Sequence, residues 1–133
     1  MLDVQRYWEV VLFSWITGNS DMHCKNFSLI DTGNGDYALS PAYDLLAVLL
    51  ADPADIEEMA MSFTVGGEKS GFDRNTFMTA FTQSGIPIAV ANKMIERMKS
   101  NLPKWEALIH QSFLPPKMNA GYCRLLKKRI ELL

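Results

Sequence analysis

Apolar residues recur at intervals of three and four along most of this chain, and this spacing constrains the fold more than any other feature. It first appears in residues 4–16, where the apolar positions form one face of an amphipathic helix. Val10 and Phe13 widen that face, so this helix is expected to be deeply buried. Gly18 and Asn19 should end it, because both residues tolerate the left-handed conformation that a helix C-terminus often adopts.

The second half of the chain shows the same spacing, interrupted by prolines and glycines. Helices are expected here over residues 73–83, 87–100, 103–113 and 119–133. Asp73 should cap the first of them, because a short acidic side chain accepts hydrogen bonds from the free N–H groups of a first turn. Pro87 and Pro103 should each open a helix, since proline is favoured at a first helical position.

The segment between these two halves departs from the helical pattern. Residues 27–30 and 37–40 are strand candidates, and a dense cluster of turn-forming residues joins them. We expect a β-hairpin there, followed by a short buried helix at 45–50 and by helix or coil at 55–61. The sequence therefore predicts a mainly α-helical fold with one small β-hairpin, in a single domain over residues 1–133.

Length and charge exclude several classes of function. The chain has 133 residues and a net charge of −2, with basic and acidic residues interleaved except at 127–129, so direct nucleic-acid binding is not expected. The longest apolar run, 45–51, is far shorter than the roughly 20 residues that cross a bilayer, and Asp3 stands where a signal peptide would be basic. Cys24 and Cys123 are far apart, which favours reduced thiols. We expect a cytoplasmic protein without membrane contacts.

Three oxygen-bearing side chains bracket the hairpin. Asp21 and Asn26 precede it, separated by four residues, and Asp44 follows it. Phosphoryl transfer requires a carboxylate that orients the attacking hydroxyl, and oxygen ligands for Mg²⁺ on the phosphates. The same order of Asp, Asn, hairpin and Asp occurs in protein kinases, where the first Asp is the base and the Asn holds a metal. The set therefore indicates phosphoryl transfer.

The residues around this set extend the match. The chain reads G-N-S-D-M-H-C-K-N-F-S over residues 18–28 and P-A-Y-D over residues 41–44. It therefore resembles the HipA-like serine/threonine kinase family, whose pattern is G-(N/A)-x-D-x-H-x-K-N-F-S, followed after a hairpin by P-x-Y-D. The resemblance implies a protein-kinase-like C-terminal lobe.

The resemblance also implies roles for five residues. Asp21 would be the catalytic base, and Lys25 would place a positive charge near the γ-phosphate of ATP. Asn26 and Asp44 would hold Mg²⁺. His23 would lie with them beside the cofactor, although a role in holding the loop through hydrogen bonds is the favoured alternative. The complete enzyme would transfer the γ-phosphate of ATP to a serine or threonine of a protein substrate, and could be a toxin paired with a DNA-binding antitoxin.

The family's kinases carry an N-terminal lobe that grips the nucleotide, upstream of the catalytic loop. Here seventeen residues precede Gly18, so we expect that lobe to be absent from this chain. It would have to come from a further part of the protein or from a gene neighbour. The isolated chain is expected to be inactive and to bind ATP weakly.

Two other functions stay open on sequence grounds. One is a non-catalytic kinase remnant that binds a partner, and the other is a fragment of a small-molecule kinase, because such enzymes share the same Asp, Asn and Asp set. Two residues also have structural alternatives. Asp44 precedes an apolar run and could be a helix N-cap, and Lys69 could be a solvated loop residue rather than a phosphate contact.

Overall fold

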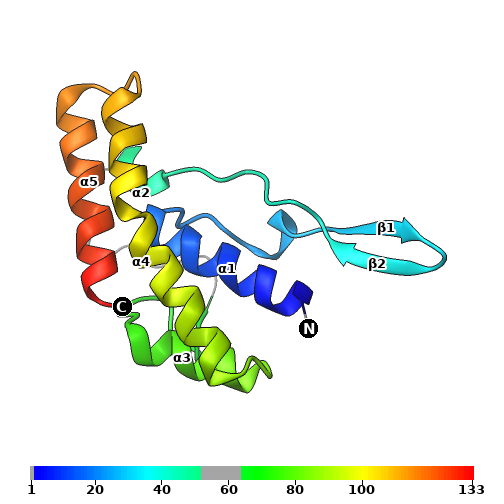
Figure 1. The fold of residues 1–133 in the computed structure, drawn as a ribbon. Helices are drawn as coiled ribbons and strands as arrows, with labels where there is room; N and C mark the ends of the chain where they lie inside the picture. Colours follow the sequence, from blue (N-terminus) through cyan, green and yellow to red (C-terminus); the bar gives the residue numbers. More distant parts are fainter. Residues whose placement is uncertain (1, 52–63) are drawn as a thin grey trace.

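The computed structural model describes residues 2–51 and 64–133, so the helix or coil expected at 55–61 lies outside the described residues. Its main helices are α1 (Leu2–Thr17), α3 (Arg74–Gln83), α4 (Ile88–Gln111) and α5 (Pro116–Glu131). Helices α4 and α5 lie antiparallel and side by side, and α1 packs against α5 (Figure 1). A hairpin of β1 (Leu29–Gly33) and β2 (Asp36–Leu39) projects away from the helices. The predicted mainly helical fold with one small hairpin is confirmed.

An aromatic cluster forms the centre of the core. The Phe77 side chain is fully buried, and its ring centroid lies 5.1 Å from that of Trp15, 5.8 Å from that of Phe72 and 6.0 Å from that of Phe81. These rings come from α1, from the segment before α3 and from α3 itself. The cluster therefore joins the first helix to the second half of the chain.

Helix α1 confirms the first predicted helix, but its burial is graded. The residues from Val11 to Thr17 are buried except for Phe13, which is half-buried, whereas Val4 is 39% exposed. The expectation of deep burial was therefore wrong for the first half of the helix. The reason is that α5 and the aromatic cluster cover its C-terminal half.

Asp73 caps α3 as predicted. Its carboxylate accepts a hydrogen bond from the Thr76 amide at 2.8 Å, and the Asp73 amide donates to the Thr76 hydroxyl at 3.4 Å. The hydrogen bond from the Thr76 amide holds the pKa of Asp73 below its usual value, because it favours the charged form.

Helix α4 corrects one prediction, since it runs without a break through Pro103. A proline inside a helix removes one backbone hydrogen bond. The turns on both sides are nevertheless held by packing, because Met98 and Ile109 are both buried and α4 contacts both α3 and α5. Tertiary burial here outweighs the local preference of proline for a first turn.

Three smaller boundaries also differ from expectation. Helix α5 begins at Pro116 rather than near residue 119, because proline is well suited to the first helical position. Helix α2 covers only Val48–Ala51. In the hairpin, Asn34 and Gly35 have φ values of 59° and 81°, which makes a two-residue turn instead of the longer loop expected.

Candidate active site

The loop that follows α1 begins at Gly18, where a side chain would crowd Leu125 and Leu49. Gly18 has a φ of 76°, and a Cβ atom there would lie 2.7 Å from Leu125 Cδ2 and 3.2 Å from Leu49 Cβ. The Leu49 amide donates a hydrogen bond to the Gly18 carbonyl at 3.1 Å. The start of the loop is therefore fixed between α5 and the segment that returns from the hairpin.

This arrangement predicts an unusual sensitivity at Gly18. Gly18→Ala should lower the free energy of unfolding by about 2–4 kcal/mol, because it adds overpacking to the cost of the left-handed conformation. Gly85→Ala is the matched control, since Gly85 has a φ of 81° but nothing within 4 Å of its Cβ position. It should lose only about 1–2 kcal/mol. Urea unfolding measures both, and equal losses would contradict the close packing.

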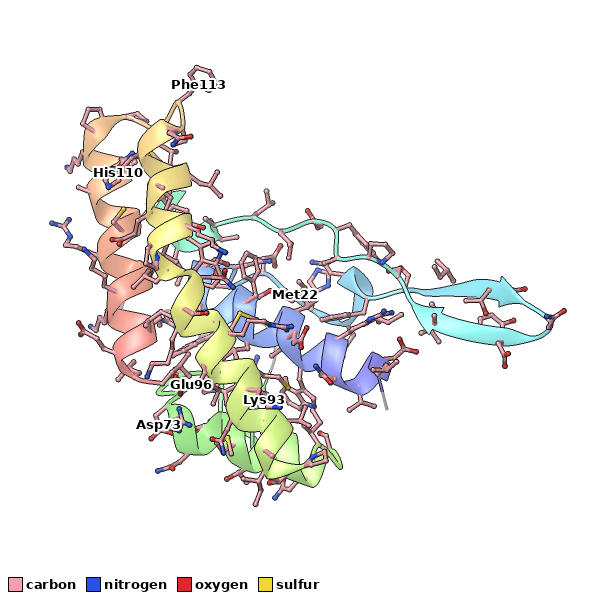
Figure 2. The ribbon with its side chains drawn as sticks, in the orientation of Figure 1. Met22, Asp73, Lys93, Glu96, His110 and Phe113 are labelled. Carbon is pink, nitrogen blue, oxygen red and sulfur yellow. The ribbon has the colours of Figure 1, made fainter. Side chains whose placement is uncertain are left out.

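The middle of the loop is anchored by one apolar side chain. Met22, which is labelled in Figure 2, is fully buried, whereas its neighbour Asp21 is exposed. A 3-10 turn over Cys24–Asn26 follows, in which the Asn26 amide donates to the His23 carbonyl at 2.9 Å. Burial of Met22 thus holds the loop on the core while the carboxylate next to it faces solvent.

Asn26 is oriented towards Asp21. Its side chain is buried, and its Nδ2 donates a long hydrogen bond of 3.5 Å to the Asp21 carbonyl. Because Nδ2 is used in the hydrogen bond to Asp21, the Oδ1 atom of Asn26 remains available to coordinate a metal ion. The spacing of four residues between the two therefore has a structural basis in this turn.

Tyr43 connects the segment after the hairpin to the end of the loop. Its hydroxyl donates to the Lys25 carbonyl at 3.0 Å and shares a hydrogen bond of 2.5 Å with the Ser28 hydroxyl. The Ser40 amide also donates to the Ser28 carbonyl at 2.8 Å. Sequence reasoning quoted Tyr43 as part of the motif but gave it no role. The signal was its place directly before Asp44.

Asp44 is exposed and adopts a left-handed conformation, with a φ of 54°. It does not cap a helix, because α2 begins only at Val48. The helix-cap alternative is therefore wrong. Among the described residues, neither the Asp44 nor the Asp21 carboxylate forms a hydrogen bond or ion pair, so both are available to a ligand.

Within the described part of the chain, the loop-holding hydrogen bonds expected of His23 are not formed at its Nδ1 atom. Its Nδ1 atom is buried, and no described residue forms a hydrogen bond with it. The same holds for Nδ2 of Asn19, at the start of the loop. Buried polar atoms without partners are rare in folded proteins. Two of them on one loop fit a site whose hydrogen-bonding partners belong to a ligand.

The side chains present fit Mg²⁺ bound together with phosphate. The described residues contain no group of three or more His, Cys, Asp or Glu side chains that could hold a metal by themselves. Mg²⁺ commonly takes only one or two carboxylates from the protein and completes its shell with water and substrate phosphates. Asp44 and the amide oxygen of Asn26 can supply that smaller share.

No helix in the part of the chain that the structure describes has the length and apolar character needed to cross a membrane.

The fold is shared with a solved structure. It matches a chain in the complex of HipA, HipB and operator DNA from the toxin-antitoxin system of Shewanella oneidensis MR-1, with a TM-score of 0.76 and 23% identity. The match covers 96% of this chain and 30% of that chain. At this identity the likeness establishes the arrangement of the helices and the hairpin.

Curated relatives are longer than this chain. The protein of Haemophilus influenzae named "Putative kinase" is 28% identical over 144 aligned residues, which cover 92% of this chain and 40% of that protein. "Putative kinase Y4dM" of Sinorhizobium fredii is 49% identical over 47 residues, which cover 35% of this chain and 12% of that protein. The chain thus spans less than half the length of these relatives. The model of the HipA-like C-terminal domain family matches residues 1–105, and the chain belongs to that family.

Proposed function

We propose that this chain is the catalytic-loop part of an ATP-dependent serine/threonine protein kinase. The observation that supports this most strongly is the pair of hydrogen bonds that the Tyr43 hydroxyl forms with the Lys25 carbonyl and the Ser28 hydroxyl, because they hold the Asp44 segment against the loop that carries Asp21 and Asn26. The residue next to Asp44 is thereby tied to the turn that contains Asn26, which supports a site shared by Asp44, Asn26 and Asp21. Membership of the HipA-like family and the kinase names of the relatives point the same way.

Each side chain has a distinct role in this proposal. The exposed carboxylate of Asp21 accepts or orients the proton of the attacking hydroxyl. Asn26 Oδ1 and the Asp44 carboxylate hold Mg²⁺, which when bound neutralises charge on the ATP phosphates. Lys25 is exposed on the 3-10 turn, where its ammonium group can approach the γ-phosphate. The unpartnered Nδ1 of His23 would bond a group of the bound cofactor.

The nucleotide-gripping lobe belongs, in this proposal, to protein outside this chain. The chain corresponds to 40% of the Haemophilus relative and 30% of the matched Shewanella chain, which leaves ample length for such a lobe in those proteins. The matched complex also contains HipB and operator DNA. We therefore propose a DNA-binding antitoxin as a partner, with the contact to DNA made by the antitoxin.

The test is transfer of labelled γ-phosphate from ATP to protein serine or threonine, measured with the full-length protein and any partner that supplies the nucleotide-gripping lobe. Transfer should require Mg²⁺ and depend on Asp21, as argued in the Discussion. Labelling of a small molecule in place of protein would support a small-molecule kinase. Failure of the complete assembly to transfer phosphate to any acceptor would contradict the proposal and favour a non-catalytic module.

The tether formed by Tyr43 gives a separate prediction. Tyr43→Phe should lower kcat about 10-fold to 100-fold, because losing both hydrogen bonds lets the Asp44 segment shift relative to the loop. Stability should change by only about 1 kcal/mol. Tyr37→Phe is the matched control, since Tyr37 is 64% exposed on the hairpin and should behave like wild type. Steady-state kinetics at several Mg²⁺ concentrations measures the effect, and unchanged kcat in Tyr43→Phe would remove the tether from the mechanism.

A further inference from the structure

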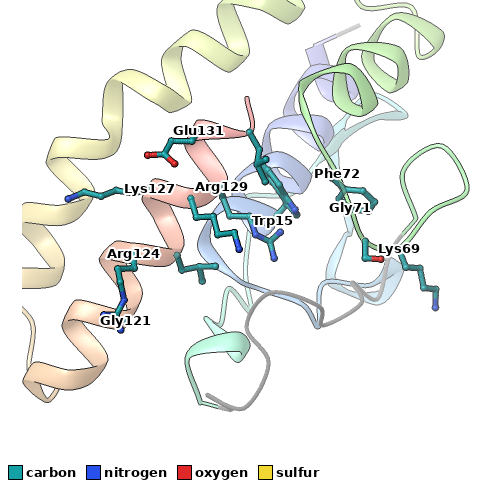
Figure 3. A pocket seen from close by; sticks show the side chains of 13 residues that line it. Trp15, Lys69, Gly71, Phe72, Gly121, Arg124, Lys127, Arg129 and Glu131 are labelled. Carbon is teal, nitrogen blue, oxygen red and sulfur yellow. The ribbon is translucent and has the colours of Figure 1, made fainter.

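A second candidate site lies between α5 and the segment that precedes α3. A pocket of about 630 Å³ is lined by α5 on one side and by the segment 69–72 on the other, with Trp15 between them (Figure 3). We call it the Arg129 pocket. It includes none of the proposed catalytic residues and none of the residues in the tether.

The described lining of this pocket is strongly basic. It contains five cationic residues and one acidic residue, Glu131, although the whole chain has a net charge of −2. The cationic residues are Lys69, Arg124, Lys127, Lys128 and Arg129. Lys127 is paired with Glu106 at 3.0 Å, so part of its charge is already balanced. Lys69, Arg124 and Arg129 still exceed the single acidic residue of the lining, so the pocket keeps an excess of positive charge.

Arg129 is the central feature of the pocket. Its side chain is only 8% exposed, and its guanidinium carbon lies 4.8 Å from the centroid of the Trp15 ring. Burial lowers the pKa of Arg129 to about 10, so the group still carries its charge at neutral pH. Among the described residues, no carboxylate pairs with it and no acceptor takes its N–H groups. The cation–π contact balances part of the cost of burying the charge, and solvent reaches the guanidinium N–H groups from the pocket.

The rest of the lining determines what kind of anion fits. Trp15, Phe72, Leu125 and Leu132 give the pocket apolar walls, and its volume suits a small organic molecule. The excess of cations favours a dianion over a monoanion, and a phosphate monoester carries close to two negative charges at neutral pH. A guanidinium group binds phosphate through two parallel hydrogen bonds. We propose that the Arg129 pocket binds a small phosphate monoester attached to an apolar or aromatic body.

Phenyl phosphate is the probe that tests this proposal, in calorimetric titrations of the 133-residue chain. It should bind with a dissociation constant of about 0.1–1 mM, as expected for a ligand of this size. Inorganic phosphate, which lacks the aromatic ring, and phenol, which lacks the phosphate, should each bind clearly more weakly than phenyl phosphate. Absence of binding by phenyl phosphate, or equally tight binding of inorganic phosphate, would overturn the proposal.

Variants locate the binding. Arg129→Met keeps the aliphatic packing on Trp15 and removes the charge, and it should weaken binding about 10-fold to 100-fold. Arg129→Lys should fall between that variant and wild type, because it keeps the charge without the planar fork. Lys117→Met is the matched control, since Lys117 lies on α5 outside the pocket and is exposed. Equal weakening in the control would indicate general charge attraction and overturn the site.

A second pair of variants keeps the test decisive if Arg129→Met does not fold. Arg124 and Lys69 are both exposed and lie on the two opposite walls of the pocket, so replacing either with Met should leave the fold intact. Each replacement should weaken phenyl phosphate binding several-fold, and circular dichroism should show unchanged helix content. Wild-type affinity in both variants would exclude the pocket as the binding site.

Discussion

Asp21→Asn should lower phosphate transfer about 100-fold to 10,000-fold in the complete kinase, because a positioned general base contributes a factor of that size. The asparagine keeps the shape of the side chain but cannot accept the proton of the attacking hydroxyl. Asp21 is exposed and forms no ion pair with the described residues, so the exchange should leave the free energy of unfolding nearly unchanged. The measurement is kcat for γ-phosphate transfer under saturating ATP and Mg²⁺.

The control for this experiment is Asp36→Asn. Asp36 is likewise an exposed aspartate, but it lies at the start of β2, beyond the tether. The Asp36→Asn substitution removes the same charge as Asp21→Asn and should keep wild-type activity. If Asp36→Asn lost as much activity as Asp21→Asn, a general electrostatic effect would explain the data. If Asp21→Asn kept full activity, the assignment of the base would be wrong.

Phe77→Ala should destabilise the protein by about 3–5 kcal/mol, which is the usual effect of removing a large aromatic side chain from a core. Phe77 is fully buried and contacts the rings of Trp15, Phe72 and Phe81, so the cavity has rigid walls that cannot easily collapse. The loss is a large part of the roughly 5–15 kcal/mol that stabilises a typical domain. Thermal unfolding should therefore show Tm lowered by roughly 10–20 °C.

Phe113→Ala is the matched control for the core. Phe113 lies in the turn between α4 and α5 and points away from the helices, with its side chain completely exposed (Figure 2). The same chemical change should therefore alter Tm very little. A comparable fall in both variants would mean that the aromatic cluster does not form the centre of the core.

Local sequence patterns predicted several elements well. The helical spacing of α1, the cap at Asp73 and the turn formers of the hairpin each act through neighbours in sequence, so they can be read without knowing the fold. The continuity of α4 through Pro103 could not be predicted from neighbouring residues. Pro103 suggests a helix start locally, and only packing of the helix against α3 and α5 holds the two halves together.

The candidate site likewise has features that the sequence predicts and features that only the fold reveals. The spacing of Asp21 and Asn26 and the motif that contains Asp44 indicated the proposed phosphoryl transfer, because side chains that bind phosphate and Mg²⁺ come from a short list of residue types. The helix-cap alternative for Asp44 could be rejected only once the start of α2 was known. The role proposed for Tyr43 depends on the tertiary structure, since its hydroxyl contacts Lys25 and Ser28, which precede the hairpin in sequence.

By itself, the sequence determined the helical class, the hairpin and the identity of the proposed catalytic side chains, because periodicity, turn chemistry and motif spacing are properties of adjacent residues. Only the tertiary structure decided how Gly18 is enclosed, which segment Tyr43 tethers and that Arg129 is buried against Trp15. These features depend on contacts between residues far apart in the chain. Such contacts arise from the burial of apolar surface as a whole, which no local pattern specifies.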